Sequence, residues 1–129
     1  MARAKKPKEP PKSEREIQIE CVKFFRERFP KQIILSISNE AAWKNWGKYE
    51  PMGCLHGAAD LLVTLKDRVF FVEMKNARGV QSDNQKAFEA KCNALGIGYY
   101  LCRNIEDFKR SILAEWEKIK NTGLQQVKP

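Results

Sequence analysis

The chain has 129 residues, of which 43% are hydrophobic, and a formal net charge of +8. This length favours one domain with a single core over two domains. The sequence contains no run near the roughly 20 apolar residues of a membrane span and no apolar signal core at its N-terminus, so we expect a soluble, cytoplasmic protein.

Half of the net charge lies in a short N-terminal segment. Residues 1–12 carry five of the 24 Lys and Arg residues and one of the 16 Asp and Glu residues, interleaved with prolines. This composition predicts a disordered basic tail. Such a tail attracts polyanions, although a solubilising leader explains it equally well. By itself, the tail identifies no substrate.

The first expected helix spans 14–29. Ser13 and Glu16 form a capping box, apolar residues then recur at helical spacing, and Pro30 ends the pattern. Glu20 falls at the edge of the apolar stripe, which makes it a carboxylate at the rim of the core. A solvated surface glutamate explains this position as well.

A strand is expected at 32–38, and a loop without sustained periodicity follows at 39–57. Loops of this length are often functional. Such a loop suits stacking on bases and pairing with phosphates, but its aromatic residues would equally well pack a short helix onto the core or onto a second subunit. The aromatic and basic residues that alternate in it are Trp43, Lys44, Trp46, Lys48 and Tyr49.

The rest of the chain predicts a hairpin, a helix, a strand and a last helix, followed by a flexible tail at 121–129. Helices and strands in this order imply an α/β domain at 13–120, with a mixed sheet flanked by helices. The last strand can lie parallel to the second strand of the hairpin, because a helix connects the two. These elements are expected at 60–65, 69–75, 82–95, 97–102 and 104–120.

The hairpin brings charged residues together. Side chains alternate along a strand, so Glu73 and Lys75 share one face. If Asp67-Arg68 is the two-residue loop, Asp60 lies opposite Lys75 and projects to the same side. The sequence therefore predicts that two carboxylates and one ammonium group meet at the end of the hairpin.

Two carboxylates in a partly desolvated place repel each other unless a cation lies between them. Lys75 supplies one positive charge, and a bound Mg²⁺ would supply two more. Such an ion would lower the pKa of a bound water and neutralise charge that develops on phosphorus. An ion pair between Glu73 and Lys75 is the structural alternative.

Several short motifs follow one another along the chain in a specific order and spacing. They are Gly53, Gly57-Ala58-Ala59-Asp60, Glu73-Met74-Lys75, Gly79 and Ser82-Asp83-Asn84-Gln85. In this order and spacing they resemble the VRR-NUC family, a branch of the PD-(D/E)xK nucleases. The likeness runs from Glu14 to about Arg103. Ala59 departs from the family pattern, which has proline before the aspartate.

The resemblance implies a restriction-endonuclease-like core and a set of site residues. Lys75 would position or polarise the attacking water. Gln85 matches a glutamine of the family, although its place in a capping box accounts for it equally well. The implied metal ligands are Asp60, Glu73, the main-chain carbonyl of Met74, and Glu20 as the acidic residue of the first helix, directly or through a water.

The function implied by the resemblance is endonucleolytic hydrolysis of DNA with Mg²⁺, for which Mn²⁺ would substitute, leaving 5′-phosphate ends. Small members of the family are similar to phage-type enzymes that cut branched DNA in bacterial or phage-infected cells, some of them as Holliday-junction resolvases. Two symmetric cuts need two sites, so we expect a C2 homodimer, assembled through 39–57 or a sheet edge. DNA contacts are expected from Trp43, Trp46, Lys44, Lys48 and Arg78.

Two alternatives remain open from the sequence. The chain could be a monomeric nuclease that cuts flaps or nicks one strand. It could also be a non-catalytic DNA-binding accessory protein, in which Glu73 and Lys75 form only an ion pair.

Overall fold

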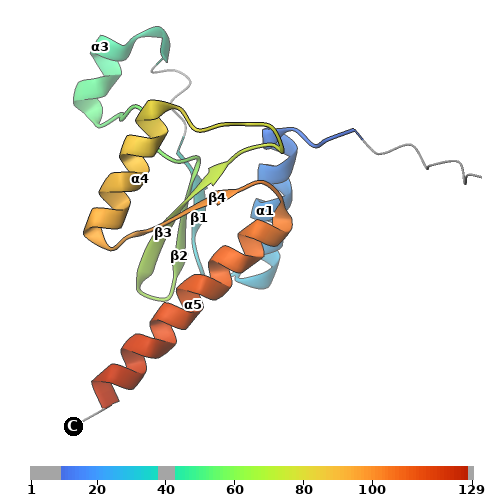
Figure 1. Cartoon of the computed structure of the whole chain (residues 1–129), viewed down its shortest axis with the longest axis vertical. Helices are drawn as coiled ribbons and strands as arrows, with labels where there is room; N and C mark the ends of the chain where they lie inside the picture. Colours follow the sequence, from blue (N-terminus) through green and yellow to red (C-terminus); the bar gives the residue numbers. More distant parts are fainter. Residues whose placement is uncertain (1–9, 38–42, 128–129) are drawn as a thin grey trace, which may run out of the picture.

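The computed structural model describes residues 10–37 and 43–127. Its sheet has four strands in the order β1-β2-β3-β4, of which β3 and β4 are parallel and the other pairs antiparallel (Figure 1). The predicted α/β class with a mixed sheet flanked by helices is confirmed. The elements are α1 (Glu14–Arg28), β1 (Ile34–Ser36), α3 (Trp46–Tyr49), the 3-10 turn η1 (Glu50–Met52), β2 (Leu61–Leu65), β3 (Arg68–Met74), α4 (Asp83–Leu95), β4 (Gly98–Cys102) and α5 (Ile105–Val127).

The central strand β3 is buried on both faces. Phe70, Val72 and Met74 point into the main core, where they meet residues of α1 and α5 such as Phe25 and Phe108. The alternate positions face α4 on the other side of the sheet. There Phe71 packs against Phe88, edge to face, with ring centroids 5.1 Å apart. A strand covered on both sides is expected to read as a continuous apolar run, so the charged residues at its end stand out.

The loop of the hairpin lies one residue earlier than predicted. Leu65 pairs with Arg68, which leaves Lys66-Asp67 as the two-residue loop. Lys66 has a positive φ of 56°. Two-residue loops that follow the right-handed twist of their strands need such a φ at the first position. The structure adopts it without the glycine or asparagine that usually marks these loops.

This change in the loop moves every cross-strand pair by two residues. The last pair of the ladder is Leu61 with Val72, so its continuation places Asp60 opposite Glu73 and not opposite Lys75. The predicted register was wrong. An even shift nevertheless keeps every side chain on its own face, so Asp60, Glu73 and Lys75 still project to one side.

Local sequence signals fix the helix that follows the hairpin. Ser82 and Gln85 form a reciprocal capping box at the start of α4, and the helix ends at Gly96 with a φ of 72°. Both ends were predicted. Ser13 caps α1 by accepting a hydrogen bond from the Glu16 N–H at 3.1 Å, which is one half of the capping box predicted there.

Two segments differ from the predicted pattern. β1 covers only part of 32–38, whose last residue lies outside the described residues, and it forms an edge of the sheet. α5 continues to Val127, since no proline stops it and the intervening glycine only weakens a helix. Most of the predicted basic tail lies outside the described residues. In the described part of the chain, no helix is both long and apolar enough to cross a membrane.

Candidate active site

The polar residues at the end of the hairpin lie in direct contact with one another. Asp60 precedes β2, and its Oδ2 accepts a hydrogen bond of 2.7 Å from the backbone N–H of Met74 at the end of β3. Lys75 Nζ lies 3.7 Å from Glu73 Oε1. The structure thus brings together the Asp60, Glu73 and Lys75 side chains, as the sequence predicted.

Glu73 is held from a second element. Its side chain is only 2% exposed, and Gln85 Nε2 on α4 donates a hydrogen bond of 2.9 Å to Glu73 Oε1. Gln85 also completes the capping box, because its Oε1 accepts from the Ser82 N–H at 2.9 Å. The two explanations offered for Gln85 are therefore compatible: the cap fixes the side chain, and the amide reaches the carboxylate.

The other oxygen of Glu73 is unusual. Glu73 Oε2 is buried and has no hydrogen-bond partner in the described part of the chain. A buried carboxylate oxygen without a donor is costly, so this one needs either a proton shared with Asp60 or a bound cation.

A second buried carboxylate shows what a purely structural role looks like. Glu115 on α5 is fully buried and accepts hydrogen bonds from Arg68 Nε and the Tyr100 hydroxyl at 2.8 Å and from Lys118 Nζ at 3.0 Å. Burial alone would raise the pKa of Glu115, but these donors bring it below its ordinary value. Glu73 lacks such a set of donors.

The electrostatics of Glu73 follow from this environment. Burial raises the pKa of Glu73 most. The neighbouring Asp60 raises it further through its charge and through a side-chain hydrogen bond with the protonated carboxyl group, and the Glu14 charge adds to this, while Lys75 opposes the shift. Without a cation, the carboxyl group of Glu73 therefore stays protonated up to a much higher pH than an ordinary glutamic acid. A divalent cation would take the place of that proton.

This shift predicts how stability depends on pH in EDTA. Since the pKa of Glu73 rises from 4.5 to about 8 on folding, the folded state keeps a proton that the unfolded chain loses in this window. The contribution of Glu73 to the free energy of unfolding is therefore complete below pH 4.5 and lost as the pH rises towards 8. The Glu73→Gln variant has no such proton to lose. Its melting temperature should exceed that of the wild type by several degrees at the top of this window.

Thermal denaturation of both proteins across this pH range, in EDTA, measures the effect. The difference in melting temperature between Glu73→Gln and the wild type should grow as the pH rises. Parallel curves for the two proteins would mean that Glu73 ionises normally.

Glu14, and not Glu20, is the α1 carboxylate that lies near Asp60 and Glu73. Glu14 lines the same cavity as Asp60, and its charge acts on Glu73. Glu20 lines a different hollow and forms an ion pair with Lys12. The position predicted for Glu20 was wrong, since the helix turns this residue towards the segment that precedes α1.

Glu14 was detectable from the sequence. At about 100° per residue, Glu14 lies within about 20° of Cys21 and Phe25 around the helix axis. Both of these residues are fully buried against the sheet. The apolar stripe of α1, extended back by two turns, therefore ends at Glu14.

Asp60 lines a cavity of about 640 Å³ between the start of α1, the ends of the strands and the start of α4, while Glu73 and Lys75 lie behind the cavity wall. A basic side chain and an aromatic one lie on its walls together with the acidic group. Residues that line it include Glu14, Arg15, Trp43, Asp60, Met74 and Gln85.

The loop between β3 and α4 is braced from β4. Arg103 follows β4, and its Nη1 donates hydrogen bonds of 2.8 Å to the carbonyl oxygens of Asn76 and Gly79. The loop begins directly after Lys75, so this brace fixes the backbone next to the ammonium group. No periodic or capping pattern in the sequence indicated a role for Arg103. Arg78, predicted to contact DNA, is exposed on the same loop.

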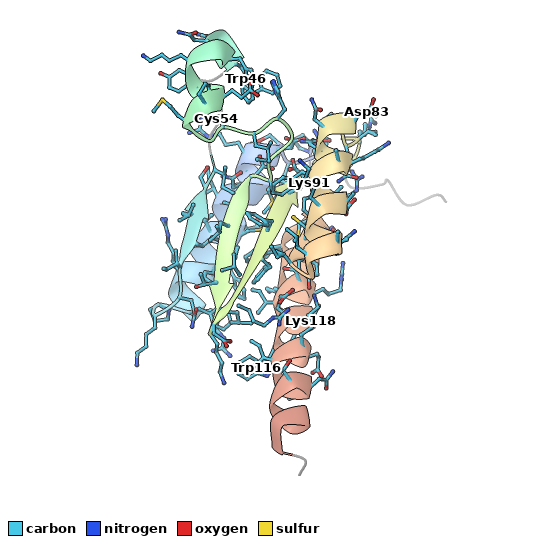
Figure 2. The ribbon with its side chains drawn as sticks, turned by 90° about the vertical axis from the view of Figure 1, so that its left-hand side faces the viewer. Trp46, Cys54, Asp83, Lys91, Trp116 and Lys118 are labelled. Atoms are coloured by element: carbon cyan, nitrogen blue, oxygen red, sulfur yellow. The ribbon has the colours of Figure 1, made fainter. Side chains whose placement is uncertain are left out.

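The aromatic residues predicted to contact DNA occupy different environments. Trp43 is 67% exposed, whereas Trp46 is partly buried and stacks on His56 with ring centroids 3.5 Å apart. Lys44 and Lys48 are exposed on the same segment. Figure 2 shows Trp46 projecting with α3 beyond the end of the sheet, near the start of α4.

The oxygen donors fit a hard divalent cation. Among the described residues, no three His, Cys, Asp or Glu side chains already lie in a metal-binding arrangement. Two carboxylates and a main-chain carbonyl remain available. Because the Lys75 N–H donates to the Cys102 carbonyl of β4 at 3.1 Å, strand alternation turns the Met74 carbonyl the other way, towards Asp60. One or two carboxylates with further oxygen ligands are what Mg²⁺ prefers.

Comparisons of the chain with protein-family models, with curated proteins and with solved structures find no match. The resemblance to the VRR-NUC family stays a prediction from the motifs.

Proposed function

We propose that this chain is a metal-dependent endonuclease that hydrolyses phosphodiester bonds in branched DNA. The observation that carries the proposal is Glu73 Oε2, which has no hydrogen-bond partner among the described residues and is buried beside Lys75 and beside Asp60, which lines the cavity. The four-stranded mixed sheet with helices on both faces supports a restriction-endonuclease-like core. The predicted motifs give the site its chemical interpretation.

Oxygen atoms of this chain would hold the cation. The donors are the Asp60 and Glu73 carboxylates and the Met74 carbonyl, and Mg²⁺ or Mn²⁺ suits them. When bound, such a cation supplies Lewis acidity and neutralises charge on the scissile phosphate. Gln85 donates to Glu73 Oε1 through its amide, so Oε2, which has no partner among the described residues, would be the oxygen that holds such a cation.

Lys75 orients the attacking water. Its Nζ is 3.7 Å from Glu73 Oε1, longer than a hydrogen bond, so the ammonium protons are available to a water molecule. The residue is buried, and the adjacent loop is braced by Arg103. A fixed donor at the reacting centre lowers the barrier by orienting the nucleophile before reaction.

Branched DNA is the proposed substrate, and a C2 homodimer with two such sites would make paired cuts in a Holliday junction. The edge at β1 supports a second copy, because no other strand of the described residues pairs with its outer side and Leu35 is 44% exposed there. Recognition would rest mainly on phosphates and DNA shape.

The test is cleavage of labelled four-way junctions, flaps and linear duplexes by the wild type, with Mg²⁺, with Mn²⁺ and with EDTA. The proposal predicts cleavage of branched DNA that EDTA abolishes. Sedimentation at micromolar concentration measures the dimer. DNA binding without cleavage under every metal condition would instead support a non-catalytic accessory protein.

The two acidic residues of α1 give a matched pair of variants. Glu14→Gln should lower the cleavage rate by about ten- to a hundredfold, because Glu14 lines the cavity with Asp60. Glu20→Gln should leave the rate unchanged, because Glu20 pairs with Lys12 elsewhere. Single-turnover cleavage with Mg²⁺ compares the two. The reverse ranking would restore the role that the sequence predicted for Glu20.

A further inference from the structure

We infer that Trp43 is a stacking platform for an unpaired nucleobase beside the scissile phosphate, so the substrates are branched DNAs with at least one unstacked nucleotide. The inference rests on the proposed function and narrows its substrate class. Trp43 is 67% exposed, yet it lines the same cavity as Asp60 and Gln85. A large indole left in solvent at the wall of such a cavity is suited to bind a flat apolar ligand.

Two aromatic rings, those of Trp46 and His56, contact the Trp43 ring. The Trp43 ring centroid lies 5.3 Å from that of His56 and 6.4 Å from that of Trp46. Trp46 and His56 themselves stack, with 21° between their planes. Trp46 and His56 face α4 across a hollow that Phe88 also lines. The indole of Trp43 is therefore held in place before a ligand arrives, which reduces the entropy lost on binding.

The three rings divide into one binding surface and two supports. Trp46 is partly buried, and its face is already covered by His56. Trp43 keeps most of its surface in solvent. The sequence could not separate these roles, because both tryptophans lie in a segment without periodicity.

The chemistry of stacking selects unpaired bases. Within a duplex both faces of each base are covered by neighbours, so an indole meets a base face only where stacking is broken. Such positions occur at flaps, gaps and the crossover of a junction. Exposed Lys44 and Lys48 on the same segment, and Arg15 in the cavity, supply charges for the adjoining phosphates.

The experiment measures binding of the full chain to labelled DNA in EDTA, which prevents cleavage. Three DNAs are compared by fluorescence anisotropy: a flap, the same flap with abasic residues at the branch, and a blunt duplex. Trp43→Ala should weaken flap binding by about tenfold or more, and Trp43→Phe should weaken it less. Binding of the abasic flap and of the duplex should not change.

Trp116→Ala is the matched control. This tryptophan lies on α5 and is 37% exposed, and Figure 2 shows it far from Trp46, towards the opposite end of the molecule. Its removal should leave all three affinities unchanged. Melting temperatures of the variants confirm that each one is folded.

The outcomes separate this inference from the proposal on which it rests. If the wild type binds and cuts branched DNA but Trp43→Ala binds the flap normally, the stacking role of Trp43 is wrong and the proposed nuclease activity is unaffected. An equal loss on the flap and the abasic flap also overturns the platform, since no base is then involved. If the wild type binds none of the DNAs in EDTA and cuts none of them with Mg²⁺ or Mn²⁺, both conclusions fall.

Discussion

Asp60→Asn is expected to lower metal-dependent cleavage by about a thousandfold while DNA binding stays intact. The amide oxygen can still accept the hydrogen bond from the Met74 N–H, so the local fold is kept. The negative charge is lost, however, and an amide is a poorer ligand for Mg²⁺ than a carboxylate. Single-turnover cleavage of branched DNA with saturating enzyme measures the effect.

The stability of this variant should not fall with its activity. In EDTA, Asp60→Asn removes the repulsion between Asp60 and Glu73 that raises the pKa of Glu73. Its melting temperature should therefore equal or exceed that of the wild type, as at sites where function opposes stability. Asp67→Asn, in the exposed hairpin loop, is the matched control and should retain full cleavage. Normal cleavage by Asp60→Asn would remove Asp60 from the site.

Gly57→Ala is expected to cause the largest loss of stability, about 3 kcal/mol in the free energy of unfolding. Gly57 has a φ of 81°, and a Cβ placed there would lie 2.2 Å from the backbone carbonyl of Asn84. Asn84 belongs to the first turn of α4, directly before Gln85. The added methyl group would thus push away the helix that holds Glu73, so cleavage should fall too.

Two other glycines separate backbone strain from collision. Gly53 has a φ of 103° and nothing within 4 Å of an added Cβ, so Gly53→Ala should cost only about 1 kcal/mol. Gly47 lies in α3 with the same open space, and Gly47→Ala should be neutral or slightly stabilising. Urea denaturation of the three variants measures the series. If Gly57→Ala were no worse than Gly53→Ala, the close approach to α4 would be refuted.

The sequence predicted which residues share a face better than it predicted which residues are paired. Alternation along β3 requires only that Glu73 and Lys75 follow an apolar run, and this pattern is unambiguous. The register depends on the loop, where Lys66-Asp67 and Asp67-Arg68 offered no glycine or asparagine to decide between them. Because both loops have two residues, the face of Asp60 was right although its partner was not.

The acidic residue of α1 shows a different limit. Glu20 lies at the edge of an apolar stripe near the middle of the helix, and the family resemblance implies a metal-binding role for it. The end of a helix is where a side chain can leave the core and reach a cavity, and Glu14 occupies that position in the first turn of α1. Helical periodicity places both residues around the axis, but only the packing of α1 on the sheet shows which end meets Asp60.

Contacts between distant segments were beyond the sequence patterns. Arg103 braces a loop more than twenty residues away in the chain, through two main-chain carbonyls. Trp43 reaches the cavity wall from a segment without periodicity. Such contacts depend on how loops fold over the end of the sheet, which local propensities do not encode.

The most direct measurement is calorimetric titration of the full chain with Mn²⁺ near neutral pH. Four proteins are compared: the wild type, Asp60→Asn, Glu73→Gln and Glu20→Gln. We predict saturable binding by the wild type and by Glu20→Gln, with affinity lowered by tenfold or more in the other two. Equal affinity in all four proteins, or no binding by the wild type, would contradict a divalent-cation site between Asp60 and Glu73.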